Sequence, residues 1–341
     1  MHGHGRFRRL LSTGLAAATA TVALLAGQTT PASAATPAIG WSMHVGPSKP
    51  LPNRDNRTFI AGVQSEIGRS LAYDTRYYTF GKDQVISARE QWAKSVGKTP
   101  FIHLNMGGCF NGGCKTRPTW AQVAKGSYDP YLEQQAAALI AYSSPVIFNY
   151  GNESNLKTQS RGTPTDFKNA WNHIVGVFRT VGVKNVTYAL TLTNGVYDQG
   201  KGDIWYPGNA TVDAIAPTGY NWACTPNHAD FGTPACDKTW RSFQQVFNSS
   251  YAYAVAHGKK LLVAETGTAE DPTVPGRKAL WILGMARTAK GWPALMGIVW
   301  FQAGKLVDYW KIDSSPGSLA AYKCVGNDPA FGGTGLACPG T

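Results

Sequence analysis

The sequence has few acidic residues and lacks the short motifs that mark several common classes of enzyme. It contains 20 Asp and Glu against 32 Lys and Arg, which gives a formal net charge of +12 at pH 7. No GxSxG elbow occurs, so the best signature of a serine hydrolase is absent. The phosphate-binding GxxxxGKS/T loop is absent too, and no GxGxxG follows a strand. There is no HExxH and no CxxC, so we expect neither a metal site nor a cofactor.

Long runs of one residue class are also missing. No run of five or more Lys or Arg occurs, which argues against nucleic acid as a partner. After the first 34 residues, no apolar stretch is long enough to span a membrane. A neutral polymer does not conflict with the basic charge, because net charge governs solubility and encounter more than fold. We therefore expect a soluble monomer.

The first 34 residues have the pattern of a secretory signal peptide. Arg6, Arg8 and Arg9 give a basic start, and an Ala- and Leu-rich stretch follows over residues 14–27. Ala32-Ser33-Ala34 then supplies a small-residue cleavage site. The sequence predicts a secreted, extracellular protein, with residues 35–341 as the mature chain and a net charge of 12 − 3 = +9.

Six cysteines are present, an even number that suggests disulfides in an exported chain. Sequence alone does not determine their connectivity. Pairing between nearest neighbours closes short loops, and we expect it here. The expected pairs are Cys109–Cys114, Cys224–Cys236 and Cys324–Cys338. The first two would stiffen long connections after strands, and the third would close a Gly-rich C-terminal tail.

The mature chain alternates short apolar runs with amphipathic segments, which is typical of a parallel sheet built from βα units. Strands are expected at 38–45, 71–74, 99–104, 145–152, 186–192, 212–216, 260–264 and 296–301. Helices are expected at 83–96, 129–142, 166–178, 240–256, 275–289 and 319–322. Eight strands in this alternation predict a single-domain (β/α)₈ TIM barrel, with no internal repeat and no linker.

Two glutamates end apolar runs and are the main candidates for chemistry. Glu153 follows the run 145–152, and Glu265 follows the run 260–264. A single Glu after a strand is often an ordinary loop residue. These two fall on the fourth and seventh strands, whose carboxyl ends meet at the active-site face of a barrel. Two carboxylates about 5–5.5 Å apart perform acid/base and nucleophilic chemistry on glycosidic bonds.

Other polar and aromatic residues fall at the same strand ends. Asn152 is placed to bond a sugar hydroxyl, and Tyr220 either holds the second glutamate or belongs to the core. Trp300 either lies under a sugar ring or packs inside the fold. Asp74 binds a sugar hydroxyl or pairs with Arg76. Further candidates for outlying sugar contacts are Trp205, Trp222 and His103.

Several segments together resemble glycoside hydrolase family 26, a barrel family that includes endo-β-1,4-mannanases. They are Trp205-Tyr206-Pro207-Gly208, Val212-Asp213-Ala214-Ile215, Gly219-Tyr220-Asn221-Trp222, Ala264-Glu265-Thr266-Gly267 and Ile298-Val299-Trp300-Phe301. The resemblance covers most of the mature chain. It implies a retaining mechanism with Glu153 as acid/base and Glu265 as nucleophile. It also implies Tyr220 beside the nucleophile and Trp300 under the sugar next to the cut.

The chain departs from the family pattern near the first glutamate. Asn152 stands where family mannanases usually have His, and the tryptophan usual a few residues later is missing. We therefore expect a secreted, retaining endo-glycosidase that binds a polysaccharide or oligosaccharide and hydrolyses β-1,4-mannan, with β-1,3-xylan or mixed-linkage β-glucan as alternative substrates. A non-catalytic carbohydrate-binding protein and a wall-associated structural protein are the rival hypotheses.

Overall fold

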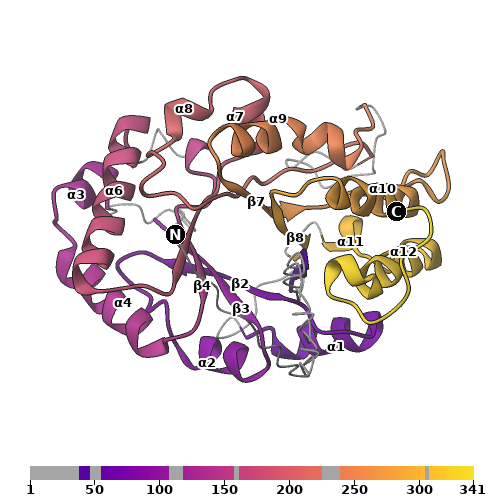
Figure 1. Ribbon diagram of the computed structural model, residues 1–341, viewed down its shortest axis with the longest axis horizontal. Helices are drawn as coiled ribbons and strands as arrows, with labels where there is room; N and C mark the ends of the chain where they lie inside the picture. Colours follow the sequence, from indigo (N-terminus) through magenta and orange to yellow (C-terminus); the bar gives the residue numbers. More distant parts are fainter. Residues whose placement is uncertain (1–37, 47–54, 107–117, 157–160, 225–238, 304–306) are drawn as a thin grey trace, which may run out of the picture. The chain divides into compact units, whose positions relative to one another are not determined.

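The fold is described from a computed structural model that covers residues 38–46, 55–106, 118–156, 161–224, 239–303 and 307–341. Eight parallel strands lie in one sheet in the order β1-β8-β7-β6-β5-β4-β3-β2. Figure 1 shows them as a ring with helices outside it. The expected (β/α)₈ barrel is confirmed. The predicted signal peptide, Cys109, Cys114 and Cys236 lie outside the described residues.

The strands agree with most of the expected ranges. They are β1 Gly40–Val45, β2 Tyr73–Thr79, β3 Thr99–Asn105, β4 Val146–Tyr150, β5 Val186–Leu190, β6 Ala214–Ile215, β7 Lys260–Thr266 and β8 Leu295–Gln302. The second strand differs most, because it runs past Asp74 to Thr79. Between β1 and β2, the Ser42 hydroxyl donates to the Tyr73 carbonyl and accepts from its amide, which brings these two strands together.

Two apolar layers are separated by the barrel wall. The inner layer fills the barrel with small and medium side chains and with two large rings, Tyr73 on β2 and Phe101 on β3. Its other members are Ile147, Ala189, Ala214, Ala216, Leu262, Ala264 and Val299. A second, larger cluster lies between strands and helices. On β8, Val299 faces inward, whereas Ile298 and Trp300 belong to the outer cluster. This alternation follows from the period of two along a strand.

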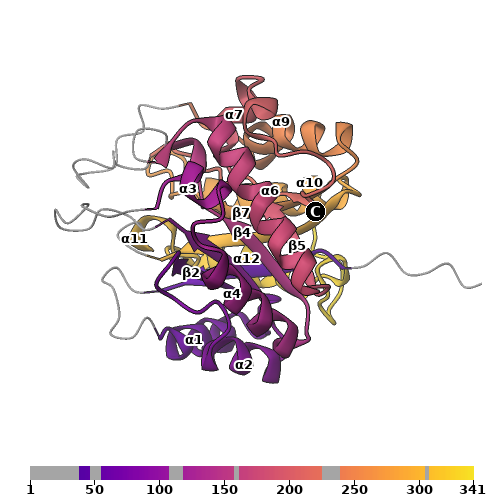
Figure 2. The ribbon, with the colours of Figure 1, turned by 90° about the vertical axis from the view of Figure 1, so that its left-hand side faces the viewer.

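The helices cover the outside of the barrel. The longer ones are α1 Arg57–Ile67, α2 Ala88–Ser95, α4 Asp129–Tyr142, α6 Pro164–Val181, α9 Phe243–Ala256, α10 Arg277–Lys290 and α12 Pro316–Asn327. Short helices are α3 Trp120–Ala124, α7 Asn194–Asp198, α8 Gly202–Trp205 and α11 Val307–Trp310, with 3-10 turns at Ser154–Leu156 and Pro329–Phe331. Figure 2 shows α4 and α6 side by side outside the strands. Capping boxes begin α2, α6 and α9, where Ser87, Thr163 and Ser242 accept from backbone amides.

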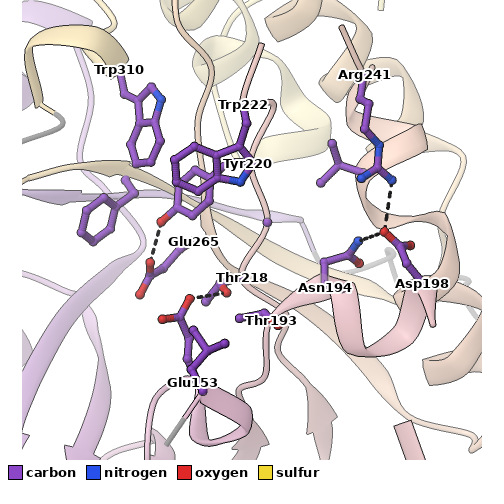
Figure 3. Close-up of a pocket in the computed structure, with 15 residues that line it drawn as sticks. Glu153, Thr193, Asn194, Asp198, Thr218, Tyr220, Trp222, Arg241, Glu265 and Trp310 are labelled. Atoms are coloured by element: carbon purple, nitrogen blue, oxygen red, sulfur yellow. Dashed lines mark hydrogen bonds and ion pairs between the residues drawn. The ribbon is translucent and has the colours of Figure 1, made fainter. Parts of the chain in front are cut away.

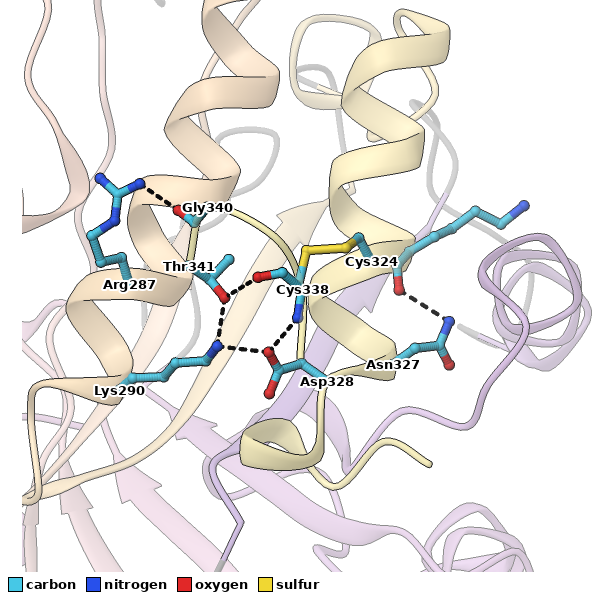
Figure 4. The surroundings of a disulfide bond; sticks show 9 residues. Arg287, Lys290, Cys324, Asn327, Asp328, Cys338, Gly340 and Thr341 are labelled. Carbon is cyan, nitrogen blue, oxygen red and sulfur yellow. Dashed lines mark hydrogen bonds and ion pairs between the residues drawn. A yellow bond between two sulfur atoms is a disulfide. The ribbon is translucent and has the colours of Figure 1, made fainter. Parts of the chain in front are cut away.

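A disulfide between Cys324 and Cys338 closes the C-terminal tail, as expected from nearest-neighbour pairing. Asp328 reinforces it by accepting from the Cys338 amide at 2.8 Å and from the Lys290 ammonium at 2.6 Å (Figure 4). Cys224 is also disulfide-bonded. Across the described part of the chain, no helix has the length and apolar character that crossing a membrane requires.

Candidate active site

A pocket of about 540 Å³ opens where the strands end, within the usual size range of ligand sites. Figure 3 shows the side chains of Glu153 and Glu265 pointing into it. The pocket is lined by Glu153, Leu156, Thr193, Asn194, Gly195, Asp198, Thr218, Gly219, Tyr220, Trp222, Arg241, Val246, Glu265, Phe301 and Trp310. The structure therefore brings together the two glutamates, Tyr220 and Trp222 of the predicted site.

A sharp turn after β4 presents Glu153. Gly151 has φ +76°, and a Cβ there would lie 2.4 Å from the Ser154 hydroxyl oxygen, so only glycine fits. Glu153 itself has φ +52°, a left-handed conformation that costs a residue other than glycine about 1–3 kcal/mol. Thr218, just after β6, donates a 2.7 Å hydrogen bond to the Glu153 carboxylate. Local strain and a fixed partner thus hold this carboxylate at the pocket.

A bulge in β7 aims Glu265 into the barrel mouth. Val263 pairs with Ile298 and Thr266 pairs with Trp300. The chain therefore advances three residues along β7 where it advances two along β8. Without the extra residue, strict alternation would turn Glu265 toward the helices, because its neighbour Ala264 already faces the interior. Bulges commonly re-aim side chains next to active sites.

Three donors hold the Glu265 carboxylate. Tyr220 donates to Oε2 at 2.5 Å, Tyr77 donates to Oε1 at 2.6 Å, and the Asn152 amide donates to Oε1 at 3.1 Å. Burial raises the pKa of both phenols well above 10, with a further contribution from the Glu265 charge. Both phenols therefore remain protonated and keep donating to this carboxylate. Asn152 contacts Glu265 directly, a contact that the sequence did not predict.

The two glutamates influence each other electrostatically. Burial and then the charge of Glu153 raise the pKa of Glu265 to about 7, whereas the hydrogen bonds from Tyr220, Tyr77 and Asn152 lower it. A buried pair of like charges resists double ionisation, so the pair retains a proton at a pH where separate carboxyls would have lost it. Such paired carboxyls with unequal surroundings are typical of acid/base chemistry.

Sequence reasoning missed Tyr77, because the expected second strand ended at Asp74. The ring of Tyr77 stacks on His103 with centroids 4.7 Å apart and lies edge-on to His44 at 5.1 Å. Burial and the nearby Arg76 lower the pKa of His44 to about 4, so its imidazole is neutral at pH 7. The ring contacts with His44 and His103 fix the position of the Tyr77 ring. The signal that could have found it is the tyrosine pair that follows Arg76 within the same strand.

Aromatic rings form the wall beside Glu265. Tyr220 stacks on Trp310 with centroids 4.1 Å apart, and Trp222 lies 5.2 Å from Tyr220. Phe301, at the end of β8, completes this wall. Flat apolar surfaces of this kind suit the C–H face of a sugar ring. Neither Phe301 nor Trp310 was among the residues expected from the sequence.

Several predicted sugar contacts lie elsewhere. Trp300 is buried outside the barrel wall and donates to the Trp310 carbonyl, so it packs in the core instead of lying under a sugar. Trp205 is buried against Trp120 and Phe167. These two rings therefore support the fold.

Two polar candidates are also buried and do not line the pocket. His103 is fully buried, with its Nδ1 3.1 Å from the Asn149 amide. Asp74 is buried and forms two hydrogen bonds with Arg89 of α2, at 2.8 and 2.6 Å. The two expected alternatives were a sugar hydroxyl and Arg76, which instead donates to Asn56. Its neighbour Tyr73 faces the barrel interior, so Asp74 faces outward, where it joins β2 to α2.

The opposite side of the pocket is polar. Asn194 and Asp198 come from α7, directly after β5, and the Asn194 amide donates to Asp198 at 3.0 Å. Arg241 pairs with Asp198 at 3.3 Å (Figure 3). In the described ranges, no three or more His, Cys, Asp or Glu side chains are grouped so as to hold a metal ion.

The fold and the site define a (β/α)₈ barrel with a carboxyl pair at the active-site face, and known proteins with this architecture are similar to the chain. No family model matches the sequence. Endoglucanase H of Acetivibrio thermocellus is 29% identical over 231 residues, which cover 63% of this chain and 24% of that protein. The chain thus spans about a quarter of the length of this curated relative.

Solved structures share the fold at low sequence identity. GH26C from Muricauda sp. MAR_2010_75 aligns with a TM-score of 0.57 and 14% identity, covering 86% of this chain and 87% of that one. A GH26 β-mannanase from Bacteroides ovatus aligns with 0.54 and 15%, covering 88% and 92%. An endo-β-1,4-glucanase from Xanthomonas axonopodis pv. citri aligns with 0.53 and 13%, covering 86% and 99%. Two of these neighbours are GH26 proteins, so the resemblance to glycoside hydrolase family 26 holds at the level of the fold.

Proposed function

We propose that the chain is a retaining endo-glycosidase in which Glu265 is the nucleophile and Glu153 the acid/base. One observation carries the proposal: Glu265 accepts three hydrogen bonds and shares a pocket with Glu153, which accepts one from Thr218. Donors stabilise the ionised form of a carboxyl. In the proposed mechanism, Glu265 is the carboxylate and Glu153 carries a proton before the first step, which is the distribution that a retaining mechanism requires.

The two steps follow from this distribution of charge. Glu153 donates its proton to the glycosidic oxygen while Glu265 attacks the anomeric carbon, so the carbon–oxygen bond to the leaving sugar breaks and a glycosyl ester forms. Glu153, now a carboxylate, takes a proton from water as the water oxygen attacks the same carbon. The ester bond breaks, and Glu265 leaves as a carboxylate.

A β-linked polysaccharide is the proposed substrate. The aromatic wall of Tyr220, Trp222 and Trp310 supports sugar binding, and the similar proteins include a β-mannanase and endoglucanases. We propose β-1,4-mannan first, with mixed-linkage β-glucan and β-1,3-xylan as the alternatives. Export through a signal peptide at residues 1–34 and action outside the cell as a monomer belong to the same proposal.

A nucleophile variant with an external nucleophile tests the roles of the two residues. Glu265→Ala should lose hydrolysis of an activated aryl β-glycoside, and azide should restore turnover by giving the α-glycosyl azide, since azide then attacks from the side of the missing carboxylate. The matched variant Glu153→Ala should give the β-azide, because the glycosyl ester still forms first. Product stereochemistry by NMR distinguishes the two outcomes.

Assays of the unmodified protein decide the substrate and the rival hypothesis. The purified mature chain is incubated with mannan, xylan and β-glucan, and new reducing ends are measured. Full turnover by Glu265→Ala without azide would refute the assigned nucleophile. Oligosaccharide binding in calorimetry without any product would instead favour a carbohydrate-binding protein.

A further inference from the structure

A second cleft of about 640 Å³ adjoins the catalytic pocket on its polar side. Asp198 and Arg241 line both spaces, so their ion pair is a shared boundary between them. The other residues lining the cleft are Thr239, Trp240, Gln244, Gln245, Asn248 and Ser249. A chain bound in the pocket and extended past Arg241 would enter this cleft.

The shared boundary is held in place from several sides. The Arg241 amide donates to the Asn221 side chain at 3.1 Å, and its carbonyl accepts from the Trp281 indole at 2.8 Å. Asp198 accepts from Asn194 at 3.0 Å in addition to its ion pair. Because Asp198 neutralises Arg241, the boundary offers polar groups without a net charge. It therefore suits uncharged, hydroxyl-rich units better than acidic ones.

Trp240 provides an aromatic surface in the cleft. The Arg277 guanidinium lies 4.4 Å from the ring centroid of Trp240, and Asp271 holds Arg277 at 2.8 Å. The half-buried ring of Trp240 is therefore anchored, while it also lines the cleft. Gln244 and Asn248 are exposed amides on the same helix, α9, and can donate to and accept from hydroxyls.

The position of the acid indicates which part of a substrate enters the cleft. Glu153 protonates the leaving oxygen in the proposed mechanism, so the leaving sugar lies on its side of the pocket. Thr193 is on this side, because its hydroxyl accepts from Asn155, two residues after Glu153, at 2.7 Å. From Thr193, α7 leads to Asp198 and the shared boundary. The polar side of the pocket thus continues in the direction of the leaving group.

We propose that the cleft over Trp240 is a distal binding site for uncharged sugar units on the leaving-group side of the cut. The inference rests on the proposed function. It predicts that substrates extended toward their reducing end gain from contacts with Trp240, and that the enzyme cuts longer chains so as to place units in this cleft.

The test compares oligosaccharides of three to six units, labelled at the reducing end, from the polysaccharide that the protein cleaves. The measured quantities are the ratio of kcat/KM for the six-unit over the three-unit substrate and the length of the labelled product. Trp240→Ala should lower this ratio about tenfold, the size of one aromatic contact, and shorten the labelled product. Trp240→Phe should restore part of the ratio.

A control variant and a second variant complete the design. Phe59→Ala removes an exposed aromatic ring from α1, which lies across the barrel from α9 in Figure 1, and should leave the ratio unchanged. Gln244→Ala removes an exposed amide, so it should fold even if Trp240→Ala does not, and should lower the ratio about threefold. This inference alone is overturned if hydrolysis proceeds with an unaltered ratio in both Trp240→Phe and Gln244→Ala. An unaltered ratio in a folded Trp240→Ala overturns it as well. No hydrolysis of any oligosaccharide by the unmodified protein overturns the proposed function and this inference with it.

Discussion

Replacing Tyr77 by Phe removes one donor from Glu265 and leaves the ring in place. The Tyr77 hydroxyl lies 2.6 Å from Glu265 Oε1, and the ring is held between His44 and His103. Phe keeps both ring contacts, so the change acts on the carboxylate through a single hydrogen bond. Tyr220 and Asn152 continue to donate.

The expected effect is a shift of the acidic limb of the pH profile. The bond from Tyr77 lowers the pKa of Glu265, so its loss raises that pKa. A hydrogen bond to a charged group contributes about 1.5–3 kcal/mol, which corresponds to about one to two pH units at 1.36 kcal/mol each. Below the limb, kcat/KM should fall about 10- to 100-fold. Above it the loss should be small, because a less stabilised carboxylate is also a better nucleophile.

Tyr78→Phe is the matched control. Tyr78 is the next residue on β2, is buried, and donates to a different carboxylate, Glu90. This variant loses the same kind of bond away from the pocket, so it should lower stability without moving the pH profile. The assay is kcat/KM for an activated aryl β-glycoside between pH 4 and 9. An acidic limb in Tyr77→Phe that coincides with those of Tyr78→Phe and the unmodified enzyme would refute the reasoning.

Two further predictions concern stability. Because burial and the second carboxylate raise the pKa of Glu265 from 4.5 to about 7, the folded chain keeps a proton that the unfolded chain releases, and stability is lost as pH rises between these values. Glu265→Gln should lack this loss, so its free energy of unfolding relative to that of the unmodified protein should rise by about 3 kcal/mol between pH 4 and pH 8; urea curves that give the same difference between the two proteins at both pH values would contradict it. Replacing Cys324 and Cys338 by Ser should lower the free energy of unfolding by about 3 kcal/mol for a loop of this length, as measured by urea denaturation. In the glycoside assay kcat/KM should stay unchanged, because the tail does not line the pocket. A large loss of activity would contradict the independence of the tail and the pocket.

The strand ends were predictable because burial and chemistry change abruptly there. Glu153 and Glu265 each follow apolar runs that have no use for a charge unless the strand ends at a site. Tyr220 follows the shortest strand, β6, and its place beside the second glutamate was implied by the family resemblance, because the residues alone left a core tyrosine open. The barrel and the carboxyl pair were therefore accessible from patterns of burial, whereas the Tyr220 donor needed the resemblance.

The misplaced residues share a different physical cause. Trp300 and Phe301 are adjacent and both apolar, so no pattern shows which one faces the pocket; the structure turns Phe301 inward and Trp300 toward the helices. In β2, Asp74 and Arg76 interrupt the apolar pattern because each has a polar partner in a neighbouring element. That interruption hid Tyr77.

The bulge in β7 explains why the site depends on more than the identity of its residues. Leu262 and Ala264 face the barrel interior, so an unbroken strand would place Glu265 among the buried apolar side chains under the helices. A carboxylate there would cost several kcal/mol without partners. The extra residue before Thr266 turns it instead toward Tyr77, whose strand, β2, lies five positions from β7 in the sheet order. The geometry of the carboxyl pair is thus set by a backbone irregularity whose position no hydrophobic period reveals, and the buried phenols of Tyr77 and Tyr220 are the partners that make the turned carboxylate stable.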